Sequence, residues 1–384
     1  MREEHDFLLS GLTTMRVGGP ARRLVTVETT DELVDAICEV DDAEEPLLVL
    51  AGGSNLVIAD EGFAGSVVRV RTAGIIVETA DSHALGSADC EVLTDAGNST
   101  GANVMVRVAA GEVWDDVVVR AVAEGWSGIE ALSGIPGCVG ATPIQNVGAY
   151  GQEVAQVIAQ VRVWDRREQR VHVLANADCQ FTYRHSLFKA RHGRYVILDV
   201  LFRLRRSALS GPIAYADLAR DLGVEAGDRV PLDEARAAVL AQRRRRGMVL
   251  DAADHDTWSC GSFFTNPVMS TASYAALEHR AQARVGAADR PAGAESPARV
   301  PRFDAPDGQV KTVAAWLIDQ AGFGKGYGLP GPAALSTKHV LALTNRGSAT
   351  TDDILVLARE IRDGVHDAFG VSLVSEPVLV GNSF

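Results

Sequence analysis

The chain has 384 residues, of which 47% are hydrophobic and 23% are charged. This composition is typical of a globular protein and excludes a disordered or low-complexity chain, and the length suggests about two or three domains. With 37 basic and 50 acidic side chains, the formal net charge is −13. A negative balance of this size argues against binding to a nucleic-acid backbone or to an anionic membrane surface.

The spacing of the cysteines and the lack of long apolar segments indicate the cellular compartment of the protein. The five cysteines are scattered without a CxxC pair, so we expect reduced thiols rather than disulfides or a zinc site. The N-terminal residues contain no apolar stretch of signal-peptide length, and no later segment approaches the roughly 20 apolar residues of a membrane span. The sequence therefore predicts a cytoplasmic protein.

Helix and strand signals alternate through the first half of the chain. Thr29 and Glu32 have capping-box spacing at the start of a predicted helix, and residues 114–123 form a second helix. Such alternation, with a strand-rich middle, is typical of an α+β protein. Apolar runs bounded by polar turns predict further strands between residues 65 and 110, and the strands 24–27, 46–50, 161–164 and 195–204.

The second half begins after a break near residues 207–212 and opens with helices over 214–222 and 232–245. Thr351 is the predicted cap of a last helix that ends at Gly370. Near the C-terminus, residues 371–374 predict a final strand, followed by Glu376.

One segment of the second half lacks any periodicity. Residues 280–307 are rich in Ala, Arg, Pro and Gly, which predicts an exposed insertion rather than a core element. The longer stretch 271–307 has no functional interpretation from sequence.

Two glycine-rich stretches suggest a ligand that carries phosphates. Both combine glycines, whose backbone N–H groups can approach an anion, with small or amide side chains. They lie about 80 residues apart and suit the two phosphates of a dinucleotide, although a purely structural turn is the alternative for the first. The candidate cofactor-binding residues are Gly52, Gly53, Ser54, Asn55, Ser133, Gly134, Ile135, Gly137, Gly140 and Ala141.

Three other motifs favour structural interpretations, and a fourth favours phosphate binding. No GxGxxG follows a strand, and residues 322–328 lack the Ser or Thr that follows the lysine of a P-loop, so they are interpreted as a helix end and a loop. Asp254-His255-Asp256 has no second ligand group and reads as a solvated loop, so no metal is predicted. Cys260 is interpreted as a packing residue, and Arg243–Arg246 as a helix end that receives phosphates.

Three polar residues have unusual sequence neighbours. Arg184 is flanked by aromatic residues and could bind a carboxylate through both of its terminal nitrogens. Ser262 lies between a glycine and two phenylalanines, and Glu376 precedes a proline. Each also has a simple structural alternative: a surface arginine, a turn serine and a strand-end carboxylate.

Taken together, these motifs resemble one family over nearly the whole chain, the UDP-N-acetylenolpyruvoylglucosamine reductases of bacterial peptidoglycan synthesis. The segments that carry the resemblance occur in a fixed order and are TTMRVGGPA (13–21), GGSN (52–55), GIPGCVG (134–140), PIQNVGAYG (143–151), YRHS (183–186), GSFFTNP (261–267), AWLID (315–319) and SEP (375–377).

The resemblance implies a fold and a reaction. The fold would be an FAD-binding domain of the vanillyl-alcohol-oxidase type over residues 1–207, with two α+β subdomains, followed by a smaller α+β substrate-binding domain over 208–384. NADPH would reduce the FAD. The flavin N5 would pass hydride to C3 of UDP-N-acetylglucosamine enolpyruvate, and Ser262 would protonate C2 to give UDP-N-acetylmuramate. The family further implies a monomer.

The resemblance also assigns roles to single residues. Arg184, Ser262 and Glu376 fall on the family's catalytic positions, and Tyr215, Asn266 and His339 fall on positions that resemble its substrate contacts. The chain departs from the family at Arg246, where a lysine is common. Arginine keeps the charge for a diphosphate but changes its geometry.

Two other functions remain open at this level. The chain could be a different oxidase of the same flavin superfamily, acting on an aldonolactone or a hydroxy acid. It could also be a paralogue that binds flavin or nucleotide without turnover. Ser262 and Glu376 argue against the oxidase, and the complete set of catalytic residue types argues against the inactive paralogue.

Overall fold

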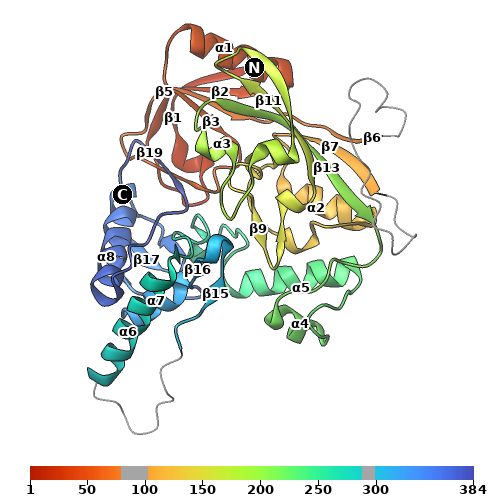
Figure 1. Ribbon diagram of the computed structural model, residues 1–384. Coiled ribbons are helices and arrows are strands. Elements are labelled where there is room, and N and C mark those ends of the chain that lie inside the picture. Colours follow the sequence, from red (N-terminus) through yellow and green to blue (C-terminus); the bar gives the residue numbers. More distant parts are fainter. Residues whose placement is uncertain (79–102, 288–298) are drawn as a thin grey trace. The chain divides into compact units, whose positions relative to one another are not determined.

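The computed structural model describes residues 1–78, 103–287 and 299–384 (Figure 1). Its contacts divide the chain into two compact units. Unit 1 comprises Met1–Phe7, Ala21–Gly53 and Ala64–Val249, and unit 2 comprises Leu8–Pro20, Ser54–Phe63 and Leu250–Phe384. The predicted site residues are therefore distributed over both units.

Two β-sheets form the framework of unit 1. Its strands are β1 (Arg2–Leu8), β2 (Pro20–Val27), β3 (Leu47–Leu50), β5 (Phe63–Val70), β6 (Ile75–Glu78), β7 (Asn103–Ala109), β8 (Trp126–Ser127), β9 (Gly148–Ala149), β10 (Gln152–Glu153), β11 (Ile158–Asp165), β12 (Arg170–Ala175) and β13 (Tyr195–Arg206). The first sheet has the order β1-β2-β5-β3, with β3 parallel to β5. In the second, the antiparallel strands follow the order β12-β11-β13-β7-β6, and β8 pairs with β13. The strands predicted before residue 207 are confirmed.

Local capping and packing explain the helices of unit 1. These are α1 (Thr30–Asp42), α2 (Trp114–Ala123), α3 (Leu187–Ala190), α4 (Ala216–Leu222) and α5 (Leu232–Arg245). The Thr29 hydroxyl accepts a hydrogen bond from the Glu32 N–H at 3.2 Å, as the capping spacing predicts. In α2, Trp114 is fully buried against Phe202, with ring centroids 5.9 Å apart. Burial of a side chain of this size contributes about 3 kcal/mol.

Helices α4 and α5 belong to unit 1 by their contacts. Leu218, Val239 and neighbouring apolar side chains bury themselves against Ala131. Arg236 of α5 donates to both carboxylate oxygens of Asp115 in α2, at 2.7 and 2.8 Å. The division between the units therefore follows residue 249, and the predicted domain boundary at residue 207 does not coincide with it.

In its described residues, unit 2 combines a three-stranded sheet and two strand pairs with three α-helices. Its strands are β4 (Leu56–Ile58), β14 (Val268–Met269), β15 (Phe303–Asp304), β16 (Val310–Lys311), β17 (Ala333–Leu335), β18 (Leu343–Asn345) and β19 (Val378–Val380), and its helices are α6 (Thr271–Ala287), α7 (Ala314–Gln320) and α8 (Thr351–Phe369). β17 and β18 form an antiparallel hairpin, whereas β19 runs parallel to β4. The buried rings of Phe263 and Phe264 lie in its core, 5.2 Å apart. Across the described parts of both units, no helix is long and apolar enough to cross a bilayer.

Most described residues of 280–307 are exposed, as predicted, but the prediction that no core element lies there is wrong at Ala281 and Val300. Helix α6 extends to Ala287, and Leu277 and Ala281 are buried in the core of unit 2. Val300 is buried as well, and its carbonyl accepts a hydrogen bond from the Tyr274 hydroxyl at 2.7 Å. Residues 288–298 lie outside the described residues. The alanine-rich composition concealed a helix whose few large apolar residues pack inward.

Two boundaries near the C-terminus also differ from the prediction. Residues 371–374 form no strand, because their only ladder-like bond runs from the Thr265 N–H to the Val374 carbonyl, at 3.0 Å. The last strand is β19, so Glu376 precedes it rather than follows the final strand. The cap of α8 is Thr350 instead of Thr351, and Gly370 ends the helix with φ of 70°, as predicted.

Replacing Thr350 by alanine is expected to lower the free energy of unfolding by about 1 kcal/mol. The Thr350 hydroxyl accepts from the Asp353 N–H at 3.1 Å, and Asp353 accepts from the Thr350 N–H at 2.9 Å. Alanine leaves the Asp353 N–H without this acceptor. Urea denaturation would measure the change, with exposed Ser348→Ala as the control. Equal stability of the two variants would contradict the capping role.

Candidate functional site

Glycines of the two predicted cofactor stretches meet in unit 1. A Cβ atom on Gly52, which follows β3, would lie only 2.5 Å from the Cα atom of Gly137. Gly140 is similarly confined, since its Cβ would lie 2.6 Å from the Ala110 Cβ. Gly53 has φ of 58°, in the left-handed region that favours glycine. These close backbones form a cradle that fits a phosphate-bearing cofactor.

The second stretch is held by charged residues of α2 and α5. Ser133 is buried, and its hydroxyl donates to the Glu130 carbonyl at 2.6 Å, whereas Ile135 packs partly against the core. The Gly134 N–H donates to Asp115 Oδ1 at 2.6 Å, and Arg243 donates to the Gly134 carbonyl at 3.3 Å. The backbone of this loop is therefore fixed before any ligand binds. Ala141 lies just beyond it, in the 3-10 helix Val139–Ala141.

The same loop lies among groups with shifted pKa values. Burial alone would raise the pKa of the Asp115 carboxyl, but the hydrogen bonds from Arg236 and Gly134 outweigh burial and lower it. Burial lowers the pKa of the Arg243 guanidinium, which Tyr150 and Asp115 partly oppose. An arginine remains charged even so, and Arg243 places a desolvated cation beside the loop.

Arg184 is hydrogen-bonded to the segment 143–151. Its φ is 53°, a left-handed conformation that costs about 1 kcal/mol in a residue other than glycine. Its guanidinium donates to the carbonyls of Asn146 and Gly148, at 3.3 and 2.8 Å. Strain of this kind at a polar residue points to function. The structure thus joins Arg184 to the segment 143–151, which follows the predicted cofactor-binding residues.

Tyr215 and Arg246 lie at the ends of α4 and α5. Tyr215 precedes α4 and is half exposed, with its ring edge-on to Tyr150 at 5.8 Å. Arg246 follows α5, and its guanidinium lies 3.5 Å from the Asp217 carboxylate. The neighbouring Arg245 forms an ion pair with Asp221. The predicted diphosphate contacts of unit 1 therefore stand among several cations and an aromatic pair.

Unit 2 brings Ser262 and Glu376 together. The Glu376 N–H donates to the carbonyl of Phe263 at 2.8 Å, which places Glu376 beside the residue after Ser262. Asn55 adds a second contact, because its side-chain amide donates to the Glu376 carbonyl at 3.4 Å. Ser54 and Asn55 belong to this unit, whereas Gly52 and Gly53 belong to unit 1. In the described part of the chain, the Ser262 hydroxyl has no hydrogen-bond partner.

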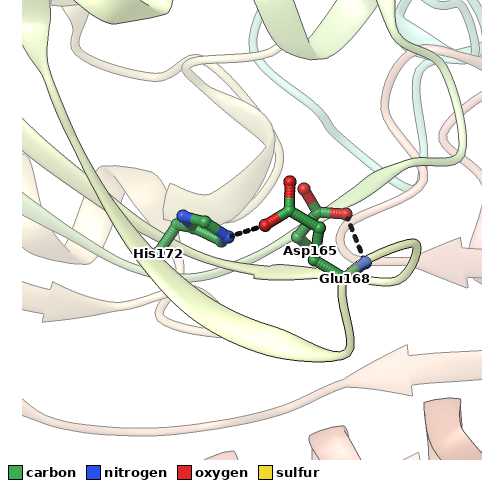
Figure 2. A group of neighbouring side chains, drawn as sticks. All are labelled: Asp165, Glu168 and His172. Atoms are coloured by element: carbon green, nitrogen blue, oxygen red, sulfur yellow. Dashed lines mark hydrogen bonds and ion pairs between the residues drawn. The ribbon is translucent and has the colours of Figure 1, made fainter.

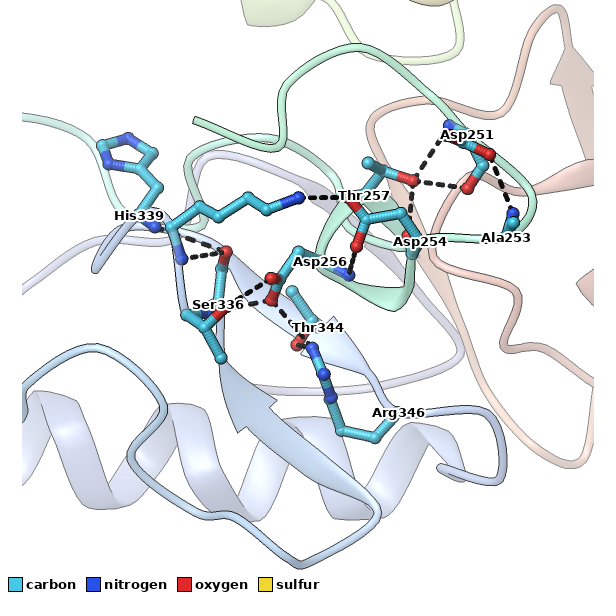
Figure 3. A network of polar contacts seen from close by, with 11 residues as sticks. Asp251, Ala253, Asp254, Asp256, Thr257, Ser336, His339, Thr344 and Arg346 are labelled. Carbon is cyan, nitrogen blue, oxygen red and sulfur yellow. Dashed lines mark hydrogen bonds and ion pairs between the residues drawn. The ribbon is translucent and has the colours of Figure 1, made fainter. Parts of the chain in front are cut away.

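Asn266 and His339 occupy different settings in unit 2. The Asn266 side-chain oxygen accepts from the Ala314 N–H at 3.0 Å, so it caps the start of α7. His339 lies in the loop between β17 and β18 (Figure 3), where its N–H donates to Ser336 Oγ at 3.3 Å. The loop reaches the neighbour of Ser262, since the Phe263 N–H donates to the Leu341 carbonyl at 2.7 Å.

The prediction that Asp254-His255-Asp256 is a solvated loop is wrong for Asp256. This carboxylate is 4% exposed and accepts hydrogen bonds from Thr337 and Arg346. Asp254 forms an ion pair with Lys338. Cations and N–H groups surround both carboxylates, which belong to one network of hydrogen bonds and ion pairs (Figure 3).

A second acidic group was not found from sequence. Asp165, Glu168 and His172 bring their ligand atoms within 4.8 Å of one another at the β11–β12 turn (Figure 2). Arg194 lies 2.6 Å from the Asp165 carboxylate and 3.1 Å from that of Glu168. The Arg194 hydrogen bond also holds the pKa of the Asp165 carboxyl below its usual value. These ion pairs stabilise the turn.

The remaining motifs have structural roles. Gly322, with φ of 105°, ends α7, and the Phe323 N–H donates back to the Ile318 carbonyl at 3.1 Å, which confirms the predicted helix end. Cys260 is buried, and burial raises the pKa of its thiol to about 12. A thiol of this kind is inert, as expected for a packing residue.

Two residues that hold the predicted sites were missed. Asp115 anchors Gly134, and Asp256 anchors the loop of His339. Asp115 carries no sequence signal beyond the usual preference for acidic residues in a first helical turn. Asp256 stood in a motif that was interpreted as a solvated loop.

Two family models match the chain. One is described as FAD binding domain and covers residues 21–174, and the other is described as UDP-N-acetylenolpyruvoylglucosamine reductase, C-terminal domain, and covers residues 253–380. The crystal structure of UDP-N-acetylenolpyruvylglucosamine reductase from Thermus caldophilus has the same fold, with a TM-score of 0.61, 24% identity and 99% of each chain covered. The predicted fold class, an FAD-binding domain followed by a smaller α+β domain, is confirmed.

Sequence relatives agree with these matches. UDP-N-acetylenolpyruvoylglucosamine reductase from Streptomyces coelicolor is 52% identical over 99% of this chain and 91% of its own length. The enzyme of that name from Salinispora arenicola is 54% identical over 97% of this chain and 94% of its own length. Similarity of this extent shows that the chain belongs to the UDP-N-acetylenolpyruvoylglucosamine reductase family, a family of oxidoreductases.

Proposed function

We propose that this protein is an NADPH-dependent flavoenzyme that reduces UDP-N-acetylglucosamine enolpyruvate to UDP-N-acetylmuramate for peptidoglycan synthesis. Family membership supports the reaction. The observation that supports it in the structure is the hydrogen bond from the Glu376 N–H to the Phe263 carbonyl, at 2.8 Å, because it links the backbone of Glu376 to the residue after Ser262. The segments that carry the proposed proton donor and the proposed carboxyl group are therefore hydrogen-bonded to each other.

The glycine cradle supports FAD as the cofactor. Gly52, Gly53, Gly137 and Gly140 would approach its pyrophosphate through backbone N–H groups, which suit an anion. When bound, FAD would accept hydride from NADPH and supply it to C3 of the substrate. The Arg243 cation and the fixed loop at Gly134 favour a ligand that brings negative charge.

The charged residues of the chain would act on the substrate. Hydride addition at C3 places negative charge on C2 and the adjacent carboxylate, and preorganised donors aimed at that charge lower the barrier. Arg184 would bind the carboxylate with its planar guanidinium. The Ser262 hydroxyl would donate its proton to C2, and Glu376 would hold a proton beside the same carbon. One hydride and one proton saturate the double bond.

Other predicted contacts would hold the sugar nucleotide. Arg246 and Tyr215 would meet the diphosphate, since the ends of α4 and α5 gather cations and an exposed ring. Asn266 and His339 would provide further contacts. The proposal also includes a cytoplasmic, monomeric enzyme without nucleic-acid, membrane or metal ligands, in keeping with the net charge of −13.

An anaerobic visible spectrum of the purified protein tests the proposal. We expect a yellow protein that bleaches with NADPH and regains its colour when UDP-N-acetylglucosamine enolpyruvate is added. Colour that returns only with oxygen would keep the flavin site and contradict the substrate. A colourless protein that takes up no added FAD would contradict the cofactor assignment at the glycine loops.

A further inference from the structure

The loop between β17 and β18 is largely buried and is held by several hydrogen bonds. It spans residues 336–342 and carries His339. The buried Ser336 hydroxyl oxygen accepts from the N–H groups of Lys338 and His339, at 3.0 and 3.3 Å. Bonds from the Ser336 N–H to the Ala342 carbonyl, at 2.8 Å, and from the Ala342 N–H to the His339 carbonyl, at 3.2 Å, close the loop.

Asp256 joins the start of this loop and the residue after β18 to one buried carboxylate (Figure 3). Its Oδ1 atom accepts from the Thr337 N–H at 2.9 Å and from Arg346 at 2.8 Å, and its Oδ2 atom accepts from the Thr337 hydroxyl at 2.5 Å. Thr337 stands at the start of the loop, and Arg346 directly follows β18. A carboxylate that receives three such bonds is a rigid anchor, because charge-assisted bonds are stronger than neutral ones.

Asp256 is itself held by its own turn. The Asp256 N–H donates to Asp254 Oδ1 at 3.0 Å, and the other oxygen of Asp254 forms an ion pair with Lys338, the residue before His339. Thr257 closes the turn, because its hydroxyl donates to the Asp251 and Asp254 carbonyls, each at 2.8 Å. Asp254 and Asp256 thus form ion pairs with Lys338 and Arg346, and both ion pairs help to hold the loop.

The loop also lies beside the predicted catalytic serine. The Leu341 carbonyl accepts from the Phe263 N–H at 2.7 Å, and Phe263 directly follows Ser262. Any displacement of the loop would therefore be transmitted to the backbone next to Ser262, because a closely packed interior transmits strain.

From these contacts we propose that Asp256 is a positioning residue that holds the loop 336–342, and His339 with it, in the arrangement that binds the sugar nucleotide. The inference rests on the proposed function. Asp256 itself contacts no substrate in this scheme and acts through Thr337 and the loop.

Asp256→Asn in the FAD-loaded protein tests the inference. Asparagine keeps the size of the side chain but removes the charge. We expect the KM for UDP-N-acetylglucosamine enolpyruvate to rise about tenfold, with a much smaller change in kcat. Reduction of the flavin by NADPH should keep its rate, and amide hydrogen exchange over residues 336–342 should become faster. Thr337→Val, which removes the hydroxyl, should raise the KM less than Asp256→Asn does. Thr337→Ser, which keeps the hydroxyl, should have the wild-type KM.

The control is Asp165→Asn. Asp165 is also a buried carboxylate that accepts from two backbone N–H groups and an arginine, but at the β11–β12 turn of unit 1. The Asp165→Asn substitution should lower the thermal stability of the protein without changing the KM for the sugar nucleotide. In a His339→Ala background, Asp256→Asn should add little to the KM, because its effect passes through His339.

The outcomes separate the inference from the proposed function. An unchanged KM in Asp256→Asn, or a rise no larger than in Asp165→Asn, would overturn the positioning role while the function stands. A slower reduction of the flavin by NADPH, by the same factor as the rise in KM, would also overturn the positioning role, because it would indicate general damage to the protein. A wild-type protein that does not bind the sugar nucleotide at all would overturn the proposed function, and this inference with it.

Discussion

Replacing Ser262 by alanine is expected to lower the rate of sugar-nucleotide reduction about a thousandfold, because a positioned proton donor is lost. The reduction of the flavin by NADPH should keep its rate, since this step needs no proton at C2. The fold should tolerate the change, because the Ser262 hydroxyl holds no other group in the described part of the chain. Stopped-flow spectroscopy of the two half-reactions would measure both rates.

A neighbouring serine provides the control. Ser259 is buried and accepts from the Gly261 N–H at 3.2 Å, so Ser259→Ala alters the same segment without removing the proposed donor. We expect this variant to retain most of its substrate reduction. Full turnover by Ser262→Ala would exclude Ser262 as the donor, and equal losses in both variants would indicate a disturbed backbone instead.

Elements with strong local signals could be predicted from the sequence. Helices α2 and α5 have the predicted bounds, and α1 begins after the predicted cap Thr29. In each, the spacing of apolar residues and the first-turn residues point to the same structure. Strand β13 was visible because its apolar run is buried on both faces.

Elements that depend on distant partners could not be predicted. Strand β12 has exposed Val171 and Val173, and it exists because β11 offers a ladder along its whole length. Helix α6 has a weak apolar pattern. Its Tyr274 and Leu277 are buried because they pack in the core of unit 2, where the Tyr274 hydroxyl also donates to the Val300 carbonyl. Tertiary contacts decide such segments, and local propensity does not reveal them.

The candidate site shows the same division. Glycine-rich loops and isolated polar residues stand out in a sequence, and the structure joins Arg184 to Gly148, and Glu376 to the neighbour of Ser262. Residues that hold these groups are ordinary acids, such as Asp115 and Asp256. Their roles arise from bonds to segments at least 19 residues away, as for Asp115 and Gly134, so spacing along the chain gives no sign of them.

Gly52→Ala is expected to weaken FAD binding about a hundredfold, because the added methyl group overpacks a contact between two backbones. Its Cβ would lie 2.5 Å from the Gly137 Cα atom and 3.0 Å from the Gly137 carbonyl carbon. The atoms that the new methyl group would meet belong to the backbone of Gly137, which cannot rotate away as a flexible side chain could, so the two loops must move apart. Their N–H groups would then miss the phosphates. Quenching of flavin fluorescence on titration of the apoprotein would measure the affinity.

Gly11→Ala is the matched control for this change, because a Cβ at Gly11 would meet nothing within 4 Å. It should bind FAD like the wild type. The melting temperature of the apoprotein separates two causes of a loss in Gly52→Ala: a large fall would indicate general unfolding, and a small fall would indicate a local defect in the cradle. Wild-type affinity in Gly52→Ala would mean that the close approach of the two loops is not needed to hold the cofactor, and the cradle would then have to be sought in the backbone around Gly134, which Asp115 and Arg243 fix independently.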